Sequence, residues 1–175
     1  MLKLDIGSGR AKFEDYITVD NDPAVGADIC ADFESSNPND KYSFKQAKDG
    51  YGQYHYWGLK DNCDEIRAHH ILEHFRPENK VKVMALFWNF LKPGGILDIE
   101  VPLFPHPASV QDPTHLSFWT AESFWYFTRG NKFGEAFAKR YSKYPVPLFE
   151  KTEEWWRGPE NDKKNCWAYG IKFKK

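Results

Sequence analysis

The sequence has few cysteines, no long apolar run and almost no net charge. Its three cysteines, Cys30, Cys63 and Cys166, lie far apart and are odd in number. That pattern suits reduced thiols better than a disulfide framework or a cysteine-based zinc site. No segment approaches the ~18 apolar residues of a membrane-spanning helix, and the first residues do not look like a signal peptide. We therefore expect a cytoplasmic protein without a membrane partner.

The balance of charge argues against a protein that holds nucleic acid mainly by neutralising phosphates. The 24 Lys and Arg residues oppose 25 Asp and Glu residues, which leaves a formal net charge of −1. We therefore do not expect a nucleic acid partner. What the chain does contain is 41% hydrophobic and 17% aromatic residues, enough for one core. We expect a single domain over residues 1–175, interrupted by a long loop or insertion at 34–62.

Short apolar-alternating or β-branched segments predict strands along the chain. In one of them Leu97, Ile99 and Val101 share a face, whereas Asp98 and Glu100 occupy the other. A central parallel strand is normally apolar on both faces, so one face of the sheet is expected to be thinly covered. The final segment alternates strictly, as a half-exposed edge strand would. The predicted strands cover residues 2–6, 16–19, 27–31, 65–69, 96–101 and 167–173.

Two helices are predicted between these strands. The first begins at Pro77 and ends at the breakers in residues 92–95. The second is capped by Thr120 and ends near Gly130. The alternation of strands and helices favours an α/β sheet with right-handed crossovers. The expected buried stripe of the first helix is Val81, Met84, Trp88 and Leu91.

A glycine turn follows the first predicted strand. Gly7 and Gly9 allow backbone amides to approach a ligand closely, and the start of a following helix would add unpaired N–H groups. Asp20 ends the second strand, eleven positions after Gly9, where its carboxylate could accept both hydroxyls of a ribose. The alternative is a tight turn at the glycines and an Asx-type turn at Asp20.

These segments resemble, in order, the motifs of the class I S-adenosylmethionine-dependent methyltransferases. Residues 90–97, with the sequence FLKPGGIL, match the lead into the fifth strand of that family. Residues 112–115 and 118–124 resemble a small bacterial and phage subgroup, a type 11-like methyltransferase. The first four motifs correspond to residues 4–10, 17–20, 27–33 and 64–75.

The resemblance implies an α/β fold, a Rossmann-like three-layer sandwich whose mostly parallel seven-stranded sheet ends in an antiparallel strand. We expect the helices that precede the first strand in the family to be absent here. The resemblance also implies S-adenosyl-L-methionine as cofactor. Gly7 and Gly9 would border its methionine part, Asp20 would take the ribose hydroxyls, Asp32 and Phe33 would hold the adenine, and His70 would close the site. The implied cofactor-binding set is Asp5, Gly7, Ser8, Gly9, Asp20, Asn21, Asp32, Phe33 and His70.

The expected activity is methyl transfer to a small-molecule or glycan-like acceptor, bound by loops and helices in residues 103–160. His115 is the candidate general base, with Asp112 orienting its imidazole; the alternative is a turn at Asp112 with His115 packed on the next helix. Five aromatic residues are either an acceptor pocket or ordinary packing: Trp119, Trp125, Tyr126, Trp155 and Trp156. A homodimer across the thinly covered face is a further hypothesis.

Two other functions remain open at this point. The first is a non-catalytic module that binds S-adenosylmethionine or S-adenosylhomocysteine. The second is a zinc hydrolase, since His70, Glu73 and His74 satisfy the H-x-x-E-H pattern. That pattern requires a long helix, whereas here it follows a strand and precedes Pro77, so we assign no metal ligand.

Overall fold

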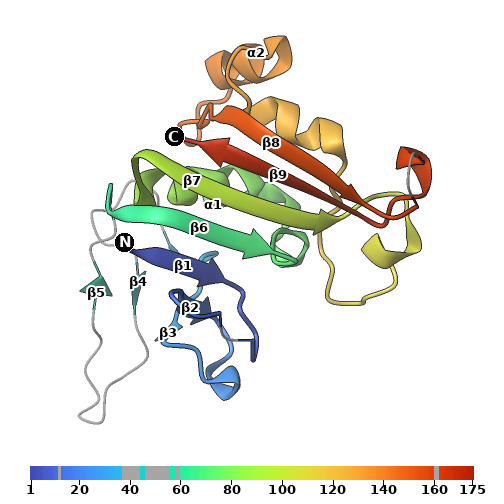
Figure 1. The fold of residues 1–175 in the computed structure, drawn as a ribbon. Coiled ribbons are helices and arrows are strands. Elements are labelled where there is room, and N and C mark those ends of the chain that lie inside the picture. The colour runs from blue at the N-terminus through green and yellow to red at the C-terminus, as the bar shows by residue number, and fades with distance from the viewer. Residues whose placement is uncertain (12, 37–43, 46–55, 58–59, 160–161) are drawn as a thin grey trace.

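The computed structural model describes residues 1–11, 13–36, 44–45, 56–57, 60–159 and 162–175. Its main element is a seven-stranded sheet with the order β3-β2-β1-β6-β7-β9-β8 (Figure 1). The neighbours from β3 to β7 pair in parallel, whereas β9 pairs antiparallel with both β7 and β8. The strands are β1 (Lys3–Ile6), β2 (Ile17–Asp20), β3 (Ile29–Cys30), β6 (Cys63–His69), β7 (Leu91–Pro102), β8 (Glu150–Arg157) and β9 (Ala168–Lys174).

The remaining elements are short. Strands β4 (Phe44–Lys45) and β5 (Tyr56–Trp57) form a separate antiparallel pair, and the rest of the predicted insertion lies largely outside the described residues. The α-helices are α1 (Lys80–Phe90) and α2 (Lys132–Arg140). Six 3₁₀ segments complete the described chain: η1 (Pro23–Val25), η2 (Leu72–His74), η3 (Pro77–Asn79), η4 (Pro107–Ser109), η5 (Ala121–Phe127) and η6 (Lys163–Asn165).

The strand predictions are confirmed in place, with one error of position. The last strand is not at an edge, because the unpredicted β8 pairs along its outer side. Strand β9 is therefore buried over most of its length. The second predicted helix is the 3₁₀ segment η5, and α2 beyond it was not predicted. The alternation of β9 reflects its two different faces and not an exposed edge.

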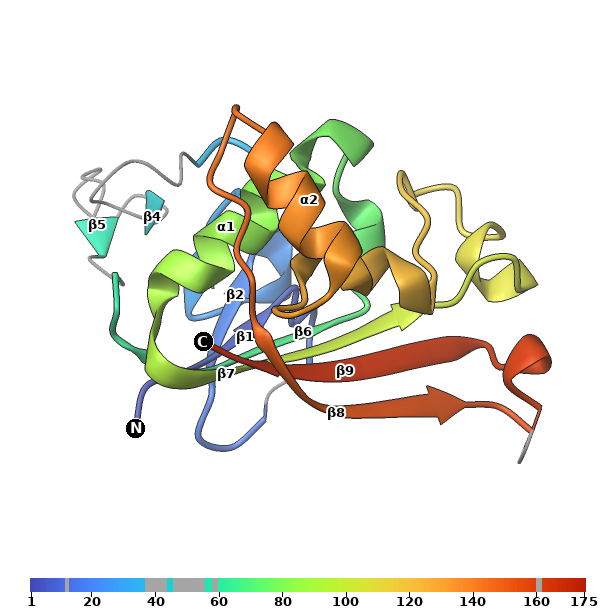
Figure 2. The same cartoon turned by 90° about the horizontal axis from the view of Figure 1, so that it is seen from above.

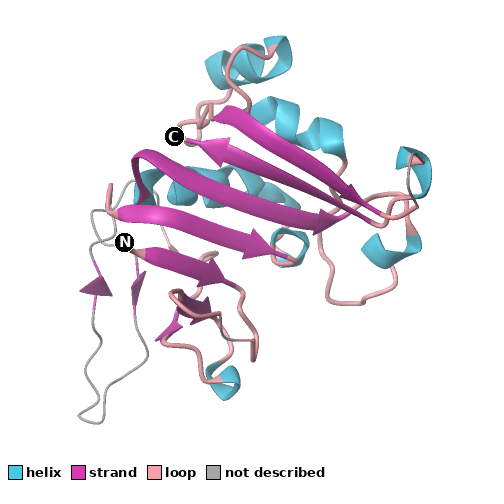
Figure 3. Ribbon diagram, in the orientation of Figure 1, coloured by secondary structure: helices cyan, strands magenta, loops and turns pink. Residues whose placement is uncertain are grey.

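The helices α1 and α2 lie on the same face of the sheet (Figures 2 and 3). The core fills the space beneath them, where alternate residues of the central strands, such as Ile66 and Ile99, meet Phe87 and Phe124. Among the described residues no helix covers the opposite face. The mostly parallel seven-stranded sheet is thus as expected, but the described chain builds one helical layer on it and not two.

The buried stripe of α1 differs in part from the prediction: Met84 is buried as expected, and Leu91 is buried as well but begins β7 instead of ending the helix. Val83 and Phe87 are fully buried, together with Met84, whereas Val81 and Trp88 are only half-buried. Both stripes have helical spacing, because apolar residues surround much of this helix. The position of the sheet decides which stripe is buried.

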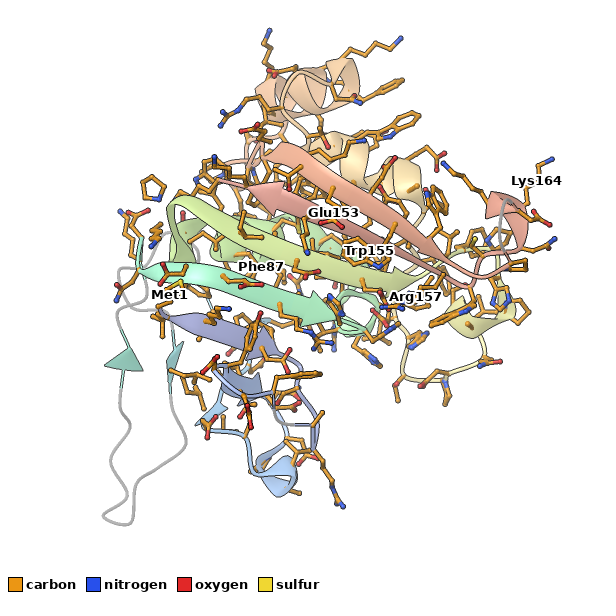
Figure 4. The ribbon with its side chains drawn as sticks, in the orientation of Figure 1. Met1, Phe87, Glu153, Trp155, Arg157 and Lys164 are labelled. Carbon is orange, nitrogen blue, oxygen red and sulfur yellow. The ribbon has the colours of Figure 1, made fainter. Side chains whose placement is uncertain are left out.

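The opposite face, here called the uncovered face, carries charged side chains that pair across strands. Arg67 lies 2.8 Å from Asp5, and His69 lies 2.7 Å from Asp98. The indole of Trp155 crosses β9 at Gly170, where a Cβ atom would lie 1.9 Å from the ring (Figure 4). The predicted polar face is present, and these charges pair within the chain, although Asp5 Oδ2 is buried without a hydrogen-bond partner among the described residues.

Candidate functional site

A cavity of about 400 Å³ lies where β1, β2 and β6 end. In parallel sheets the carboxyl ends of the strands meet at one edge, and ligands bind in the crevice there. Pockets of this volume are typical of small-molecule sites. The cavity is lined by Ile6, Gly7, Gly9, Val19, Asp20, Asn21, Asp32, Phe33, Glu34, His70, Ile71, His74, Phe75 and Thr114.

Two glycines form the floor of the cavity after β1. Both have positive φ angles, +70° at Gly7 and +55° at Gly9, which residues other than glycine rarely adopt. A Cβ at Gly7 would lie 2.5 Å from the side chain of Ile71, whereas a Cβ at Gly9 would meet no atom within 4 Å. The backbone at Gly9 therefore leaves space beside the cavity that a ligand can use.

No helix follows this turn in the described residues, and β2 is the next element. The unpaired N–H groups of a helix start, expected from the glycine pattern, are therefore not part of the site. The backbone amide of Gly7 instead donates to the carbonyl oxygen of Val19 at 2.7 Å. The glycine turn is held by the neighbouring strand.

Asp20 lies at the end of β2 and joins two walls of the cavity. Its Oδ2 accepts a hydrogen bond from the backbone N–H of Gly9 at 2.9 Å, and its Oδ1 accepts one from Asp22 at 3.0 Å. Each carboxylate oxygen has a second lone pair. The Asx-type turn and the ligand role are thus compatible, because the turn fixes the carboxylate and leaves acceptor capacity.

Asp32 and Phe33 form the wall beyond β3. Asp32 is exposed, and its Oδ1 accepts a hydrogen bond from the backbone of Glu34 at 2.8 Å. Phe33 is 4% exposed and packs edge-on against Phe75 and Phe87. Phe33 is therefore a core residue with one edge at the cavity.

Two residues of the expected cofactor set, Ser8 and Asp5, do not line the cavity, whereas Asn21 does. Asn21 lines the cavity beside Asp20. Ser8 is nearly buried and does not line it; its hydroxyl donates to the carbonyl oxygen of Gly9 at 3.4 Å. The Asp5 side chain pairs with Arg67 on the uncovered face and does not reach the cavity. Its role is to hold β1 against β6.

His70 closes the cavity at the end of β6, with a φ angle of +54°. Its Nε2 lies 3.1 Å from Glu100, and its Nδ1 lies 3.7 Å from Glu73. The hydrogen bond to Glu100 first, and then the nearby carboxylate of Glu73, raise the pKa of His70 to about 9. The imidazole is therefore cationic at neutral pH, and it places a positive charge at the cavity wall.

Sequence reasoning missed Glu100 as the partner of His70. Glu100 is 3% exposed and also accepts hydrogen bonds from Trp155 at 2.8 Å and Arg157 at 2.7 Å. Burial alone would raise the pKa of this carboxyl, but hydrogen bonds from His70, Trp155 and Arg157 lower it to about 2. The sequence signal that could have identified Glu100 was a charged residue near the end of an otherwise apolar strand.

His115 and Asp112 lie in the loop after β7, one layer behind the cavity wall. The His115 ring contacts His74 with centroids 4.9 Å apart, but His115 itself does not line the cavity. Asp112 does not orient this imidazole by a hydrogen bond, because its Oδ2 is 3.9 Å from Nε2. The carbonyl oxygen of Ser109, 3.0 Å from Nδ1, orients the ring instead.

The Asp112 carboxylate is engaged in its own turn. Its Oδ1 accepts hydrogen bonds from the amide of Thr114 at 2.8 Å and from its hydroxyl at 2.7 Å. Both hydrogen bonds lower the pKa of Asp112. The turn anticipated as the alternative at this position is present.

The five aromatic residues do not form one pocket. Trp119 is core, Trp155 lies on the uncovered face, and Trp125 and Tyr126 are exposed. Trp125 and Trp156 both line a second cavity of about 510 Å³ near η5 and β8. An acceptor pocket built from all five residues is ruled out.

The helical zinc arrangement of H-x-x-E-H is also not formed. His70 ends β6 and bonds to Glu100, while Glu73 and His74 belong to η2, which has only three residues. The two histidines do not lie on successive turns of one long helix, as that motif requires. This finding removes the zinc-hydrolase alternative in the form that the sequence suggested.

Comparison with family models and with curated proteins finds no match. Solved structures do match. A SAM dependent methyltransferase from Archaeoglobus fulgidus superposes with a TM-score of 0.62 at 16% identity, over 99% of this chain and 85% of that one. The 1,6-didemethyltoxoflavin-N1-methyltransferase of Burkholderia thailandensis was solved with S-adenosylhomocysteine. It gives a TM-score of 0.56 at 14% identity, over 99% of this chain and 70% of that one.

A third similar structure is a 16S rRNA adenine N1-methyltransferase from Catenulisporales acidiphilia. Its TM-score is 0.51 at 12% identity, over 99% of this chain and 83% of that one. At these identities the likeness shows the fold, which is the class I methyltransferase fold. The acceptors of these proteins differ, so the likeness leaves the acceptor of this chain open.

Proposed function

We propose that this chain, which has the class I methyltransferase fold, binds S-adenosylmethionine and transfers its methyl group to an acceptor. The observation that carries the proposal is the cavity itself. It gathers Gly7, Gly9, Asp20, Asp32 and His70 at the carboxyl ends of β1, β2, β3 and β6. Some of the similar structures contain S-adenosylhomocysteine, the product of such a transfer.

The residues of the cavity fit this cofactor. Asp20 is held by two backbone amides and has acceptor capacity for the ribose hydroxyls. The open space at Gly9 gives room for the methionine part, and Asp32 with Phe33 would hold the adenine. When bound, the cofactor supplies an electrophilic methyl group on a sulfonium. The protein's contribution is to place the acceptor in line with that methyl group.

The acceptor in this proposal is a small molecule or a glycan-like compound. It would approach from the loops in residues 103–160, of which Thr114 reaches the cavity wall. His115 would serve as base only if the loop moves, because His115 is not part of the wall. One of the similar structures is that of a 16S rRNA methyltransferase. A search for the acceptor therefore has to include RNA.

The second candidate is a non-catalytic binding module. The observation in its favour is the position of His115, whose side chain is 9% exposed and separated from the cavity by His74. A cofactor site without an adjacent base is compatible with binding alone. Transfer of label from methyl-labelled S-adenosylmethionine to cell-extract components separates the two, since only an enzyme consumes the cofactor.

Calorimetric titration with S-adenosylhomocysteine tests the binding step. We expect micromolar binding by the wild-type chain and at least ~10-fold weaker binding by Asp20→Asn, which removes the charge that a bidentate diol contact uses. Asp22→Asn is the matched control, because this neighbouring aspartate is exposed and does not line the cavity. Failure of the folded wild type to bind, or equal binding by Asp20→Asn, contradicts the proposal.

A further inference from the structure

Three side chains with metal-ligating atoms converge beside the cavity. Glu73 and His74 come from η2, and His115 comes from the loop after β7. One ligand atom of each lies within 4.8 Å of the others, and no second group of this kind occurs in the described part of the chain. His115 lies more than forty positions from the adjacent pair Glu73 and His74, so the fold brings it to them.

Glu73 is the unusual member, because it is a buried carboxylate without a complete set of partners. It is 2% exposed, and its Oε2 has no hydrogen-bond partner. Its Oε1 lies 3.7 Å from His70 Nδ1 and 4.0 Å from His115 Nε2, both beyond hydrogen-bond distance. A buried carboxylate that lacks a partner is costly unless a cation compensates it.

His115 Nε2 lies 4.0 Å from Glu73 Oε1, and one ring nitrogen of His74 belongs to the same group. His115 Nδ1 lies 3.0 Å from the carbonyl oxygen of Ser109, and His74 Nδ1 lies 3.2 Å from that of Thr114. A carbonyl oxygen only accepts, so each Nδ1 is the donor, and in the neutral imidazole that a metal binds Nε2 then carries the lone pair. Metal-bound histidines are characteristically held in this way, by a second hydrogen bond to a carbonyl or carboxylate.

The loop that carries His115 is fixed against Glu73. The amides of Leu116 and Ser117 donate to the carbonyl oxygen of Glu73 at 2.8 and 2.9 Å, and the Ser117 hydroxyl donates to Leu72 at 3.2 Å. These bonds fix the backbone that carries His115 against η2. The fold therefore keeps the three residues of the group next to one another.

We propose that Glu73, His74 and His115 bind a divalent transition-metal cation such as Zn²⁺. Two imidazoles and one carboxylate are a ligand set that suits zinc and its neighbours and does not suit Mg²⁺ or Ca²⁺, which prefer oxygen. Three protein ligands leave a coordination position open. Because His74 and Thr114 line the cavity, that position lies beside it.

This set differs from the helical pattern in the sequence, because His115 replaces His70. His70 is bonded to Glu100 and is not in the cluster. Asp112 Oδ2, 3.9 Å from His115 Nε2, is the next oxygen on the solvent side. The site stands on these contacts alone and does not depend on the bound cofactor.

The test is calorimetric titration of the chelator-treated, dialysed full chain with ZnCl₂, without S-adenosylhomocysteine. We expect one Zn²⁺ per chain, and at least ~10-fold weaker binding by Glu73→Gln and by His74→Gln. A Co²⁺ titration gives a second readout, since its visible d–d absorption changes when imidazole and carboxylate replace water. His69→Gln is the matched control, because this histidine pairs with Asp98 on the uncovered face.

Each outcome decides the proposal. Stoichiometric binding that is lost in Glu73→Gln and His74→Gln and retained in His69→Gln supports it. Failure of the folded wild type to bind Zn²⁺ or Co²⁺, or equal binding by these variants, overturns it. If Glu73→Gln does not fold by circular dichroism, His74→Gln, which is partly exposed, decides. A separate titration with S-adenosylhomocysteine in the presence of chelator shows whether the cofactor site binds its ligand without the metal.

Discussion

At the scale of single residues, the two glycines of the first turn have different requirements. Gly7 needs both its positive φ and the absence of a side chain, because a Cβ there would overlap Ile71. Gly9 needs only its positive φ, because the space around it is open. One glycine pattern in the sequence thus combines a packing constraint with a ligand-facing gap.

We expect Gly7→Ala to lower the free energy of unfolding by about 2–4 kcal/mol, from backbone strain and overpacking together. Gly9→Ala should cost only the strain, about 1–2 kcal/mol. Urea unfolding of both variants measures the difference. Equal losses would mean that Ile71 relaxes freely and that the contact at Gly7 carries no constraint.

Glu100 should make the stability of the fold depend on acid pH. Its folded pKa of about 2 lies below the ordinary value of 4.5, so its contribution is complete above pH 4.5 and disappears as pH falls toward 2. The shift corresponds to about 3 kcal/mol. Glu100→Gln should flatten this part of a plot of unfolding free energy against pH. Glu78→Gln, at an exposed position, is the control and should leave it unchanged.

At the scale of elements, α1 shows how far periodicity alone can be trusted. Apolar residues with helical spacing occur on more than one side of this helix, and the sequence favoured Val81 and Trp88. The sheet instead buries Val83 and Phe87. The helix was predictable, whereas its buried side depended on the strand against which it packs.

A matched pair of valines tests this orientation. Val83→Ala removes two buried methyl groups and should cost about 2–3 kcal/mol of unfolding free energy. Val81→Ala, at a half-buried position, should cost less than about 1 kcal/mol. Thermal or urea unfolding of the two variants compares them. A larger loss at Val81 would favour the stripe expected from the sequence.

At the scale of the whole molecule, the sheet has helices on one side and paired charges on the other. The class I fold is present although described helices cover only one face. The pairs Arg67–Asp5 and His69–Asp98 allow that face to meet water without exposing apolar strands. No helix of the described chain is long and apolar enough to cross a membrane.

The homodimer across the uncovered face remains a hypothesis. A contact between two such faces would be largely ionic, so its dimer fraction should fall as salt screens the charges. Light scattering at micromolar concentration and increasing ionic strength measures this. A monomer at the lowest salt would remove the hypothesis, and a dimer insensitive to salt would place the contact elsewhere.

The sequence by itself determined the order of strands, the glycine turn and the acid at the end of β2. These features are local, because alternation, glycine and chain order suffice to specify them. Gly7, Gly9 and Asp20 were expected at a ligand site from these patterns, and residues 21, 32, 33 and 70 from the resemblance to the methyltransferase family; all of them line the cavity. Their roles toward a cofactor remain proposals.

Only the tertiary structure decided which distant side chains meet. It turned Asp5 toward Arg67, joined His70 to Glu100 and placed His115 beside Glu73. It also put β8 outside β9 and left one sheet face uncovered. Such contacts depend on strand register and on loop paths between segments thirty to sixty residues apart. No local pattern encodes them, because each partner is compatible with several positions until the sheet is assembled.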